Sequence, residues 1–298
     1  MTNIASARRI LFVVNPKSGK DDTDWEKSIN DYFGSVDVET EHLQLEQNCD
    51  PQTIADRIEV FQPDRVIAVG GDGTVKLVAE QLLDKPTISL GILPAGSANG
   101  MAKELSIPLK PEEALALCHK GIPKKIHLVK VNDHICIHLS DVGFNAFVIK
   151  TFENYAARGM WGYVKASFKA LLQHDKLLVK ISTDMGEVQR KAAMIVIANA
   201  RRYGSGALIN PRGKLDDGLF EVIVVRKISF EEIFKMMVTH RAYDPAKTEV
   251  FQCKYLRINS PKSAHFQVDG EYLGKTKHVE ATILPAAISI IVPPELLR

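Results

Sequence analysis

A strand, a glycine-rich turn and a helix follow one another between residues 65 and 83, and this order limits the folds open to the chain. Residues 66–69 are a short, mainly β-branched apolar run, which indicates a buried strand. After Thr74, apolar residues recur at 75, 78, 79, 82 and 83, the spacing of a helix face. The glycines of such a turn let the backbone approach an anion and take positive φ, while the first N–H groups of the helix point at it. The stretch therefore predicts an anion site.

Asp72 lies inside this turn, and its carboxylate alone would repel a phosphate group. It suits such a site if it holds Mg²⁺ against the phosphates or accepts a proton from a hydroxyl group. The alternative from the residues alone is an ordinary strand–helix turn of an α/β domain, in which Asp72 caps the helix.

The first 108 residues alternate between strand-like and helix-like segments. Strands are predicted at 10–14, 36–42, 66–69 and 88–93, and helices at 25–33, 51–61, 75–83 and 101–105. This alternation predicts a parallel sheet with helices on both faces, where ligands bind at the carboxyl ends of the strands. Three of the strands end in turns of small and polar residues, at 15–20, 70–74 and 96–100. Together these turns would form a polar site of nucleotide size.

From about residue 126 the pattern changes to strand-like runs separated by short turns. Runs are predicted at 126–131, 135–139, 177–182, 193–198, 219–225, 250–258 and 265–268, followed by a hairpin of 279–284 and 287–292. They predict an antiparallel sandwich or open barrel with two inserted helices, at 152–174 and 230–240. We therefore expect two domains, 1–125 with the site of nucleotide size and 126–298 with the antiparallel strands, and the last residues packing back on the first.

Composition bears on the partners, the redox compartment and the membrane topology expected of this chain. A net charge of +2 over 298 residues does not require nucleic acid as a partner. The four cysteines form no C-x-x-C pair, which favours free thiols in a reducing compartment. No segment reaches the roughly 20 apolar residues of a membrane span. We expect a cytoplasmic protein.

Five motifs resemble those of the diacylglycerol kinase catalytic-domain family. They are N-P-K-S-G at 15–19, G-G-D-G-T at 70–74, P-A-G-S-A-N at 94–99, L-D-D-G-L at 215–219 and V-D-G-E at 268–271. The family contains bacterial lipid kinases and the eukaryotic sphingosine and ceramide kinases. The resemblance implies a lipid kinase that uses ATP and Mg²⁺ and phosphorylates a hydroxyl group of diacylglycerol or a sphingoid lipid. It also implies a Rossmann-like, phosphofructokinase-like α/β domain, a C-terminal antiparallel β-sandwich domain, and chemistry in the cleft between them.

The resemblance also assigns roles to single residues. Those expected to line the ATP site are Asn15, Ser18, Gly19, Gly71, Asp72, Gly73, Thr74, Ser97 and Asn99. Asp72 and Glu271 are the catalytic candidates, and either could be the base. The Lys214 carbonyl, the Asp217 side chain and the Leu219 carbonyl resemble a structural Mg²⁺ site.

Without the resemblance, two of these motifs have simpler interpretations. Residues 268–271 would be an Asp-Gly hairpin turn with Glu271 in solvent, and residues 216–218 a plain acidic turn. In addition, Leu77, Gly100 and Asn145 stand where members of the family often carry acids.

Two alternative functions follow. The missing acids are compatible with a catalytically weak lipid- or nucleotide-binding regulator. An NAD kinase-like enzyme would share G-G-D-G-T and the two-domain plan, but the turns at 15–19 and 94–99 favour a lipid kinase.

A peripheral membrane contact is predicted between Arg158 and Lys176. On a helix, one face would carry Trp161, Val164, Phe168, Leu171 and Leu172, and the adjacent face Arg158, Lys165, Lys169 and Lys176. Such a helix could lie against anionic headgroups. The alternative is a helix that packs its apolar face on the second domain. A homodimer is also compatible with the sequence.

Overall fold

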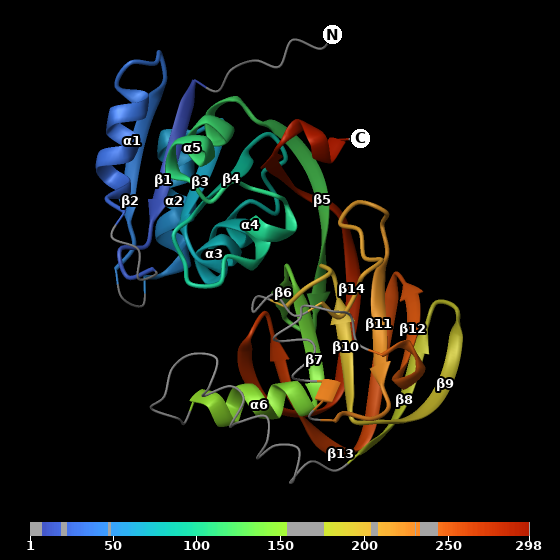
Figure 1. Ribbon diagram of the computed structural model, residues 1–298. Coiled ribbons are helices and arrows are strands. Elements are labelled where there is room, and N and C mark those ends of the chain that lie inside the picture. The colour runs from blue at the N-terminus through green and yellow to red at the C-terminus, as the bar shows by residue number, and fades with distance from the viewer. Residues whose placement is uncertain are drawn as a thin grey trace. The chain divides into compact units, whose positions relative to one another are not determined.

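The computed structural model describes residues 8–18, 23–46, 49–153, 176–203, 208–229, 231–232 and 244–297. The chain divides into two compact units, Met1–Ile126 with Ala286–Arg298, and His127–Pro285. Two strands, β5 (Ile122–Val131) and β14 (Glu271–Val292), carry the chain between the units (Figure 1).

The first unit contains a parallel sheet in the order β4-β3-β1-β2. Its strands are β1 (Arg9–Val14), β2 (Glu39–Gln44), β3 (Arg65–Gly70) and β4 (Ser89–Pro94). All of β3 and β4 is buried, as expected for apolar strands covered on both faces. Since β2 lies on one side of β1 and β3 on the other, the strand order reverses between β1 and β3. Doubly wound sheets bind ligands at such a point.

Five helices flank this sheet. They are α1 (Trp25–Phe33), α2 (Pro51–Phe61), α3 (Asp72–Gln81), α4 (Gly100–Glu104) and α5 (Pro111–Lys120). Helix α1 packs against α5, and α2 packs against α3 (Figure 1). Helix α5 was not expected from the sequence. Its last carbonyls are held by the buried guanidinium of Arg65, which donates to Cys118 O at 2.6 Å and to Gly121 O at 3.2 Å. A cation at this end also opposes the helix dipole.

The second unit is built from antiparallel strands, in the order β12-β11-β10-β7-β13-β14. A hairpin of β8 and β9 joins β13, and β6 pairs with β5. The remaining bounds are β6 (His134–Cys136), β7 (Leu139–Gly143), β8 (Leu177–Thr183), β9 (Gly186–Ala192), β10 (Met194–Ala198), β11 (Phe220–Val225), β12 (Thr248–Cys253) and β13 (Tyr255–Val268).

Strand β10 is buried on both faces and divides the core of this unit. Ile195 and Ile197 belong to the larger apolar cluster, which includes residues of β8, β13 and β14. Met194 and Val196 belong to a second cluster with Phe144 of α6 (Phe144–Glu153). Strand β10 therefore contributes to two apolar clusters, one formed with β8, β13 and β14 and the other with α6.

Several predicted elements need correction. The hairpin around Pro285 is wrong, because β14 is one strand from Glu271 to Val292. It bends at Ala286, where φ is 48°, and its last part pairs in parallel with β4, Ser289 opposite Ser89. The helix predicted from residue 152 already begins at Phe144. Residues 154–175 lie outside the described residues, as does the helix predicted at 230–240 except for 231–232.

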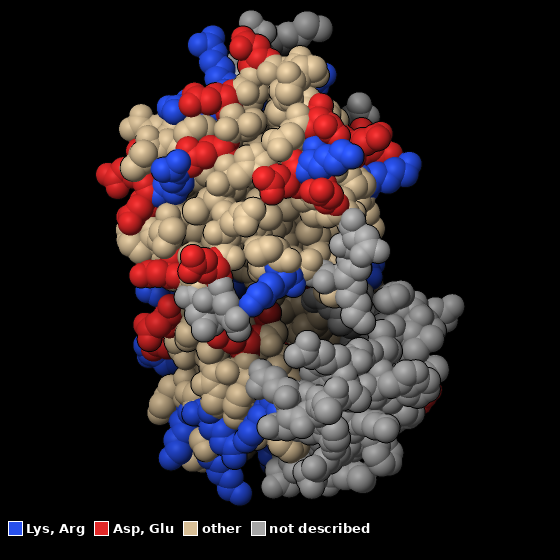
Figure 2. Space-filling model, turned by 90° about the vertical axis from the view of Figure 1, so that its left-hand side faces the viewer, with Lys and Arg blue, Asp and Glu red and all other residues tan. Residues whose placement is uncertain are grey.

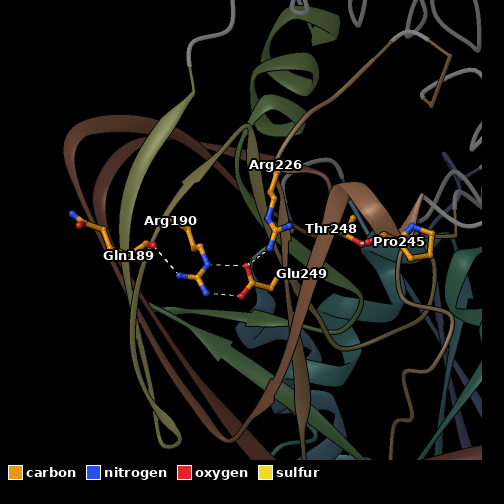
Figure 3. A network of polar contacts seen from close by, with 6 residues as sticks. All are labelled: Gln189, Arg190, Arg226, Pro245, Thr248 and Glu249. Carbon is orange, nitrogen blue, oxygen red and sulfur yellow. Dashed lines mark hydrogen bonds and ion pairs between the residues drawn. The ribbon is translucent and has the colours of Figure 1, made fainter.

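One carboxylate joins three strand segments of the second unit (Figure 3). Glu249 accepts from Arg190 Nε and Nη2 at 2.8 and 2.7 Å, and from Arg226 Nη2 at 2.8 Å. Its side chain is only 19% exposed. The hydrogen bonds from Arg190, followed by those from Arg226, lower the pKa of Glu249 to about 2. Charge-assisted bidentate pairs of this kind fix geometry as well as adding energy.

We predict that Glu249→Gln lowers the free energy of unfolding by about 1 kcal/mol, a value discounted for the solvent around both arginines. Since the folded-state pKa lies below the ordinary value, this contribution is present above about pH 4.5 and is lost as the pH falls toward 2. Urea unfolding at several pH values measures both. Glu187→Gln, which removes an exposed pair with Lys180, is the matched control and should change little. Equal losses in the two variants would contradict the assignment.

Candidate active site

Three of the predicted turns meet at the carboxyl edge of the parallel sheet. They follow β1, β3 and β4, which are neighbours in the order β4-β3-β1. The turns after β1 and β3 flank the point at which the strand order reverses. The prediction that these segments converge is therefore confirmed for the described residues, which exclude Gly19 and Lys20.

The turn after β1 is tied to the turn after β3. The Asn15 backbone N–H donates to Val69 O at 3.0 Å, and its Nδ2 donates to Thr74 Oγ1 at 3.2 Å. Thr74 is only 4% exposed, so its hydroxyl serves this contact inside the protein. Gly70 leaves the space for it, because a Cβ there would lie 2.3 Å from Thr74 Oγ1. Asn15 and Thr74 thus position the turns rather than projecting from them.

The Asp72 side chain ties the turn after β3 to the start of α4. Its Oδ2 accepts from Gly100 N and its Oδ1 from Met101 N, both at 2.9 Å. Asp72 lies in the first turn of α3, so one carboxylate holds the N-termini of two helices together. The sequence left open that Asp72 caps a helix. Asp72 does cap a helix, but the capped helix is α4 and not α3, which carries Asp72.

Asn99 closes the turn after β4 upon itself. It has a left-handed backbone (φ 51°), and its Oδ1 accepts from Gly96 N at 2.9 Å. Its Nδ2 donates to Pro94 O at 3.2 Å and to Gly96 O at 2.7 Å. This turn packs closely against the turn after β3, since a Cβ on Gly96 would lie 2.3 Å from Gly71 Cα.

Gly70 and Gly96 are needed in these turns for their small size. Gly71 has a φ of −91°, and Gly70, Gly73 and Gly96 also lack positive φ, contrary to the expectation from the sequence. Gly73 is exposed, and a Cβ there would meet nothing within 4 Å. Ser97 is also exposed and Ser18 is half-buried. The open backbone at Gly73, in the first turn of α3, is the part of the turns that an anion can approach.

The V-D-G-E segment of the second unit forms a hairpin turn between β13 and β14. Asp269 and Gly270 have φ of 51° and 90°, as a two-residue type I′ turn requires. The Asp269 carboxylate accepts from Ile137 N at 3.0 Å and from His138 N at 2.8 Å. Glu271, the next residue, is exposed. Asp269 therefore fixes the turn, and Glu271 extends into solvent.

A buried carboxylate missed by the sequence analysis supports the same turn. Asp141 is fully buried and accepts from Gln267 Nε2, from Asn145 Nδ2 at 2.6 Å and from Ala146 N at 2.8 Å. Gln267 Oε1 in turn accepts from Gly270 N at 2.7 Å. Burial raises the pKa of Asp141 to about 6 against the opposing effect of these donors. Asn145, where the family often has an acid, is thus a donor from the first turn of α6 to an acid on β7.

The L-D-D-G-L segment packs on a buried histidine. His127 N donates to Leu215 O at 2.7 Å, and Gly218 N lies 3.3 Å from His127 Nδ1. Burial lowers the pKa of His127, while the charges of Asp217 and Asp216 act in the opposite direction. Asp217 is exposed, and its Oδ1 accepts from Leu219 N at 3.1 Å. The segment is therefore an anchored acidic turn.

Two family models match the chain. The model described as "Diacylglycerol kinase catalytic domain" matches residues 9–131, and the "YegS C-terminal NAD kinase beta sandwich-like domain" matches residues 140–292. A "Probable lipid kinase YegS-like" of Serratia proteamaculans (strain 568) is 33% identical over 242 residues, covering 77% of this chain and 76% of the relative. A protein of the same name from Pectobacterium atrosepticum is 29% identical over 297 residues, covering 96% of both chains.

A solved structure has the same fold. The crystal structure of a putative diacylglycerol kinase from Bacillus anthracis str. Sterne matches with a TM-score of 0.79 and 20% identity, covering 98% of this chain and 99% of that chain. These matches confirm the predicted fold class, an α/β N-terminal domain followed by a β-sandwich domain. At this identity the solved structure supports the fold alone.

We predict opposite effects on stability for two glycine substitutions. Gly96→Ala should lower the free energy of unfolding by on the order of 1–3 kcal/mol, because its Cβ would overlap the Gly71 backbone. Gly73→Ala should raise it by up to about 1 kcal/mol, because it adds a better helix former in open space. Urea unfolding of both variants checks the packing of the turns. A Gly96→Ala protein as stable as the parent would show that the turns are not in close contact.

Proposed function

Because this chain belongs to the diacylglycerol kinase catalytic-domain family, we propose that it is a lipid kinase that transfers the γ-phosphoryl group of ATP to a lipid hydroxyl group. Since the matching family model describes a kinase catalytic domain, the chain is a kinase. The acceptor class, diacylglycerol or a sphingoid lipid, follows from the resemblance of the motifs. The names of the relatives support a lipid acceptor in general terms.

The observation that carries the proposal is the set of three connected turns at the carboxyl edge of the first sheet. Contacts of Asn15 with Thr74 and of Asp72 with α4 hold the turns together without using the open backbone at Gly73. Phosphoryl transfer needs phosphates held in a fixed position more than it needs covalent chemistry from the protein. We propose that the backbone around Gly71 and Gly73 holds the ATP phosphates, with Ser18, Gly19 and Ser97 beside them.

Asp72 is the proposed ligand of the catalytic Mg²⁺. Its carboxylate lies in the turn beside the open backbone at Gly73 and is held in place by Gly100 N and Met101 N, and a carboxylate oxygen can accept more than one contact. The residue therefore fits a metal-binding role in addition to its structural one. When bound, Mg²⁺ neutralises charge that develops on the transferred phosphoryl group.

Glu271 is the proposed base that accepts the proton of the lipid hydroxyl. It is exposed, and the Asp269 and Gln267 contacts fix the turn that carries it. These contacts limit the positions open to the Glu271 backbone, as a positioned base requires.

The turn of residues 214–219 is the proposed structural Mg²⁺ site. Its donors would be the Lys214 and Leu219 carbonyls and the Asp217 carboxylate, an all-oxygen set that suits this hard ion. The exposed position of Asp217 leaves room for water ligands, which Mg²⁺ retains. The donor set therefore fits the ion.

Two alternatives remain open to experiment. An NAD kinase-like activity is motivated by the second family model, whose description names an NAD kinase-like sandwich. A weakly active regulator is motivated by Gly100 and Asn145, which stand where the family often has acids. Both residues donate hydrogen bonds to carboxylates, so neither supplies a carboxylate of its own. The intact protein should be incubated with ATP and Mg²⁺ and either diacylglycerol, a sphingoid lipid or NAD. Lipid phosphorylation alone supports the proposal, NAD phosphorylation supports the first alternative, and binding without turnover supports the second.

We predict that Glu271→Gln leaves the stability of the protein unchanged and lowers kcat by at least about 100-fold, because an exposed side chain is altered and a base is lost. Turnover and urea unfolding are measured on the same samples. Glu187→Gln, which alters another exposed carboxylate of the same unit, is the control. Activity within about tenfold of the parent would remove Glu271 from the reaction.

We predict that Mg²⁺ raises the melting temperature of the parent in the absence of nucleotide, and that Asp217→Ala abolishes this rise. A ligand that binds only the folded state stabilises it, and the variant loses the single carboxylate of the site. Asp216→Ala removes an adjacent exposed acid and is the matched control. A melting temperature that still rises with Mg²⁺ in Asp217→Ala would count against this site.

A further inference from the structure

A cavity of about 420 Å³ lies in the second unit, apart from the residues assigned above. It is bordered by α6, by the start of β8 and by the part of β13 around residues 260–265. None of the residues proposed for ATP, metal or proton transfer lines it. Its volume falls in the range of small-molecule sites.

The cavity exists because β13 bulges at this place. The pairing of β13 with β14 shifts between Asn259 and Ala264, so the residues between them leave the ladder. On the other side, Ser260 Oγ donates to Leu178 O at 3.3 Å and holds the bulge against β8. Bulges of this kind redirect side chains at functional places.

One wall of the cavity is apolar and firmly held. The ring of Phe147 stacks on His265, with 4.8 Å between ring centroids and 28° between planes. His265 Nδ1 lies 2.8 Å from the Tyr272 hydroxyl. Leu177 and Leu178 continue the wall, and Leu178 is 40% exposed. This wall can hold hydrocarbon.

The charged part of the lining is entirely positive. Among the described lining residues, Lys176 and Lys262 carry charge and no carboxylate is present. Within the described part of the chain, neither lysine makes an ion pair. Lys277 is exposed on β14 opposite the bulge, since its neighbours Thr276 and His278 pair with Ala264 and Asn259.

The surface at this end of the unit has the same sign. Figure 2 shows Lys and Arg side chains at the lower end of the view, the height at which Figure 1 labels β13, with no acidic side chain among them. Higher on that face, basic and acidic side chains are mixed.

We propose that this cavity binds an anionic phospholipid of a membrane surface. Lys176 and Lys262 contact the phosphate, the Ser263 hydroxyl donates to it, and the first part of an acyl chain lies along Phe147 and Leu177. Paired cations beside an exposed apolar wall are complementary to such a lipid. A neutral acceptor lipid would leave both lysines without a counter-charge, so the site serves docking to the membrane rather than phosphoryl transfer. Lys176 is also the described end of the stretch predicted to contact membranes.

The test measures co-sedimentation of the intact protein with phosphatidylcholine vesicles, with and without phosphatidylglycerol. Lys176→Gln and Lys262→Gln should each weaken binding to the anionic vesicles by about fivefold, and together by about 25-fold. Leu178→Ser should weaken the binding that persists at high salt, where charge is screened. Lys254→Gln is the matched control, because Lys254 is exposed on the same unit, immediately before β13, and does not line the cavity.

Two outcomes would overturn the proposal. If the lysine variants bind as tightly as the parent, or if Lys254→Gln loses as much as they do, this cavity is not the contact. If inorganic phosphate at physiological concentration displaces the protein from vesicles while Leu178→Ser has no effect, the cavity is a phosphate site without a lipid role. Unchanged melting temperatures of the variants exclude unfolding as the cause of lost binding.

Discussion

The Asp72 carboxylate holds the first unit's site together, because it binds the first two N–H groups of a helix that begins 28 residues later. That contact fixes the turn after β3 to the turn after β4, and Asn15 fixes the turn after β1 to Thr74. Within the described residues, these contacts connect the three short loops to one another at the edge of the sheet. Connected loops suit phosphate positioning, since loosely held donors must first be ordered.

The same contact changes how a G-G-D-G-T turn is interpreted. An aspartate in such a turn suggests metal binding or proton transfer, yet here its first function is to satisfy helix N–H groups that otherwise lack partners. A carboxylate oxygen can accept more than one contact, so a structural role and a metal-binding role are compatible in one residue. A substitution at Asp72 therefore alters the position of α4 as well as any metal. Glu271 is exposed, so a substitution there can change the reaction rate without changing the stability of the protein.

Local patterns predicted the elements and the turns, but not the partners of the side chains. The helix at 51–61 and the turns after β1, β3 and β4 follow from periodicity and glycine placement. The side chains of Thr74 and Asn99, expected to line the ATP site, make hydrogen bonds within the protein that the sequence did not indicate. Pro285 suggested a chain reversal, but β14 continues into the first unit, where pairing with β4 determines its path. The role of Asp141 could not be predicted from local sequence, because the antiparallel sheet and α6 bring its partners Gln267 and Asn145 to it.

The central claim is that ATP phosphates bind at the backbone of the connected turns. An amide NMR titration of the parent protein with Mg²⁺-ATP tests it most directly, with adenosine as a ligand that lacks phosphates. The account predicts that the amides of Gly71, Gly73 and Ser97 shift with Mg²⁺-ATP and not with adenosine. Shifts confined to other parts of the chain, or equal shifts with both ligands, would contradict it.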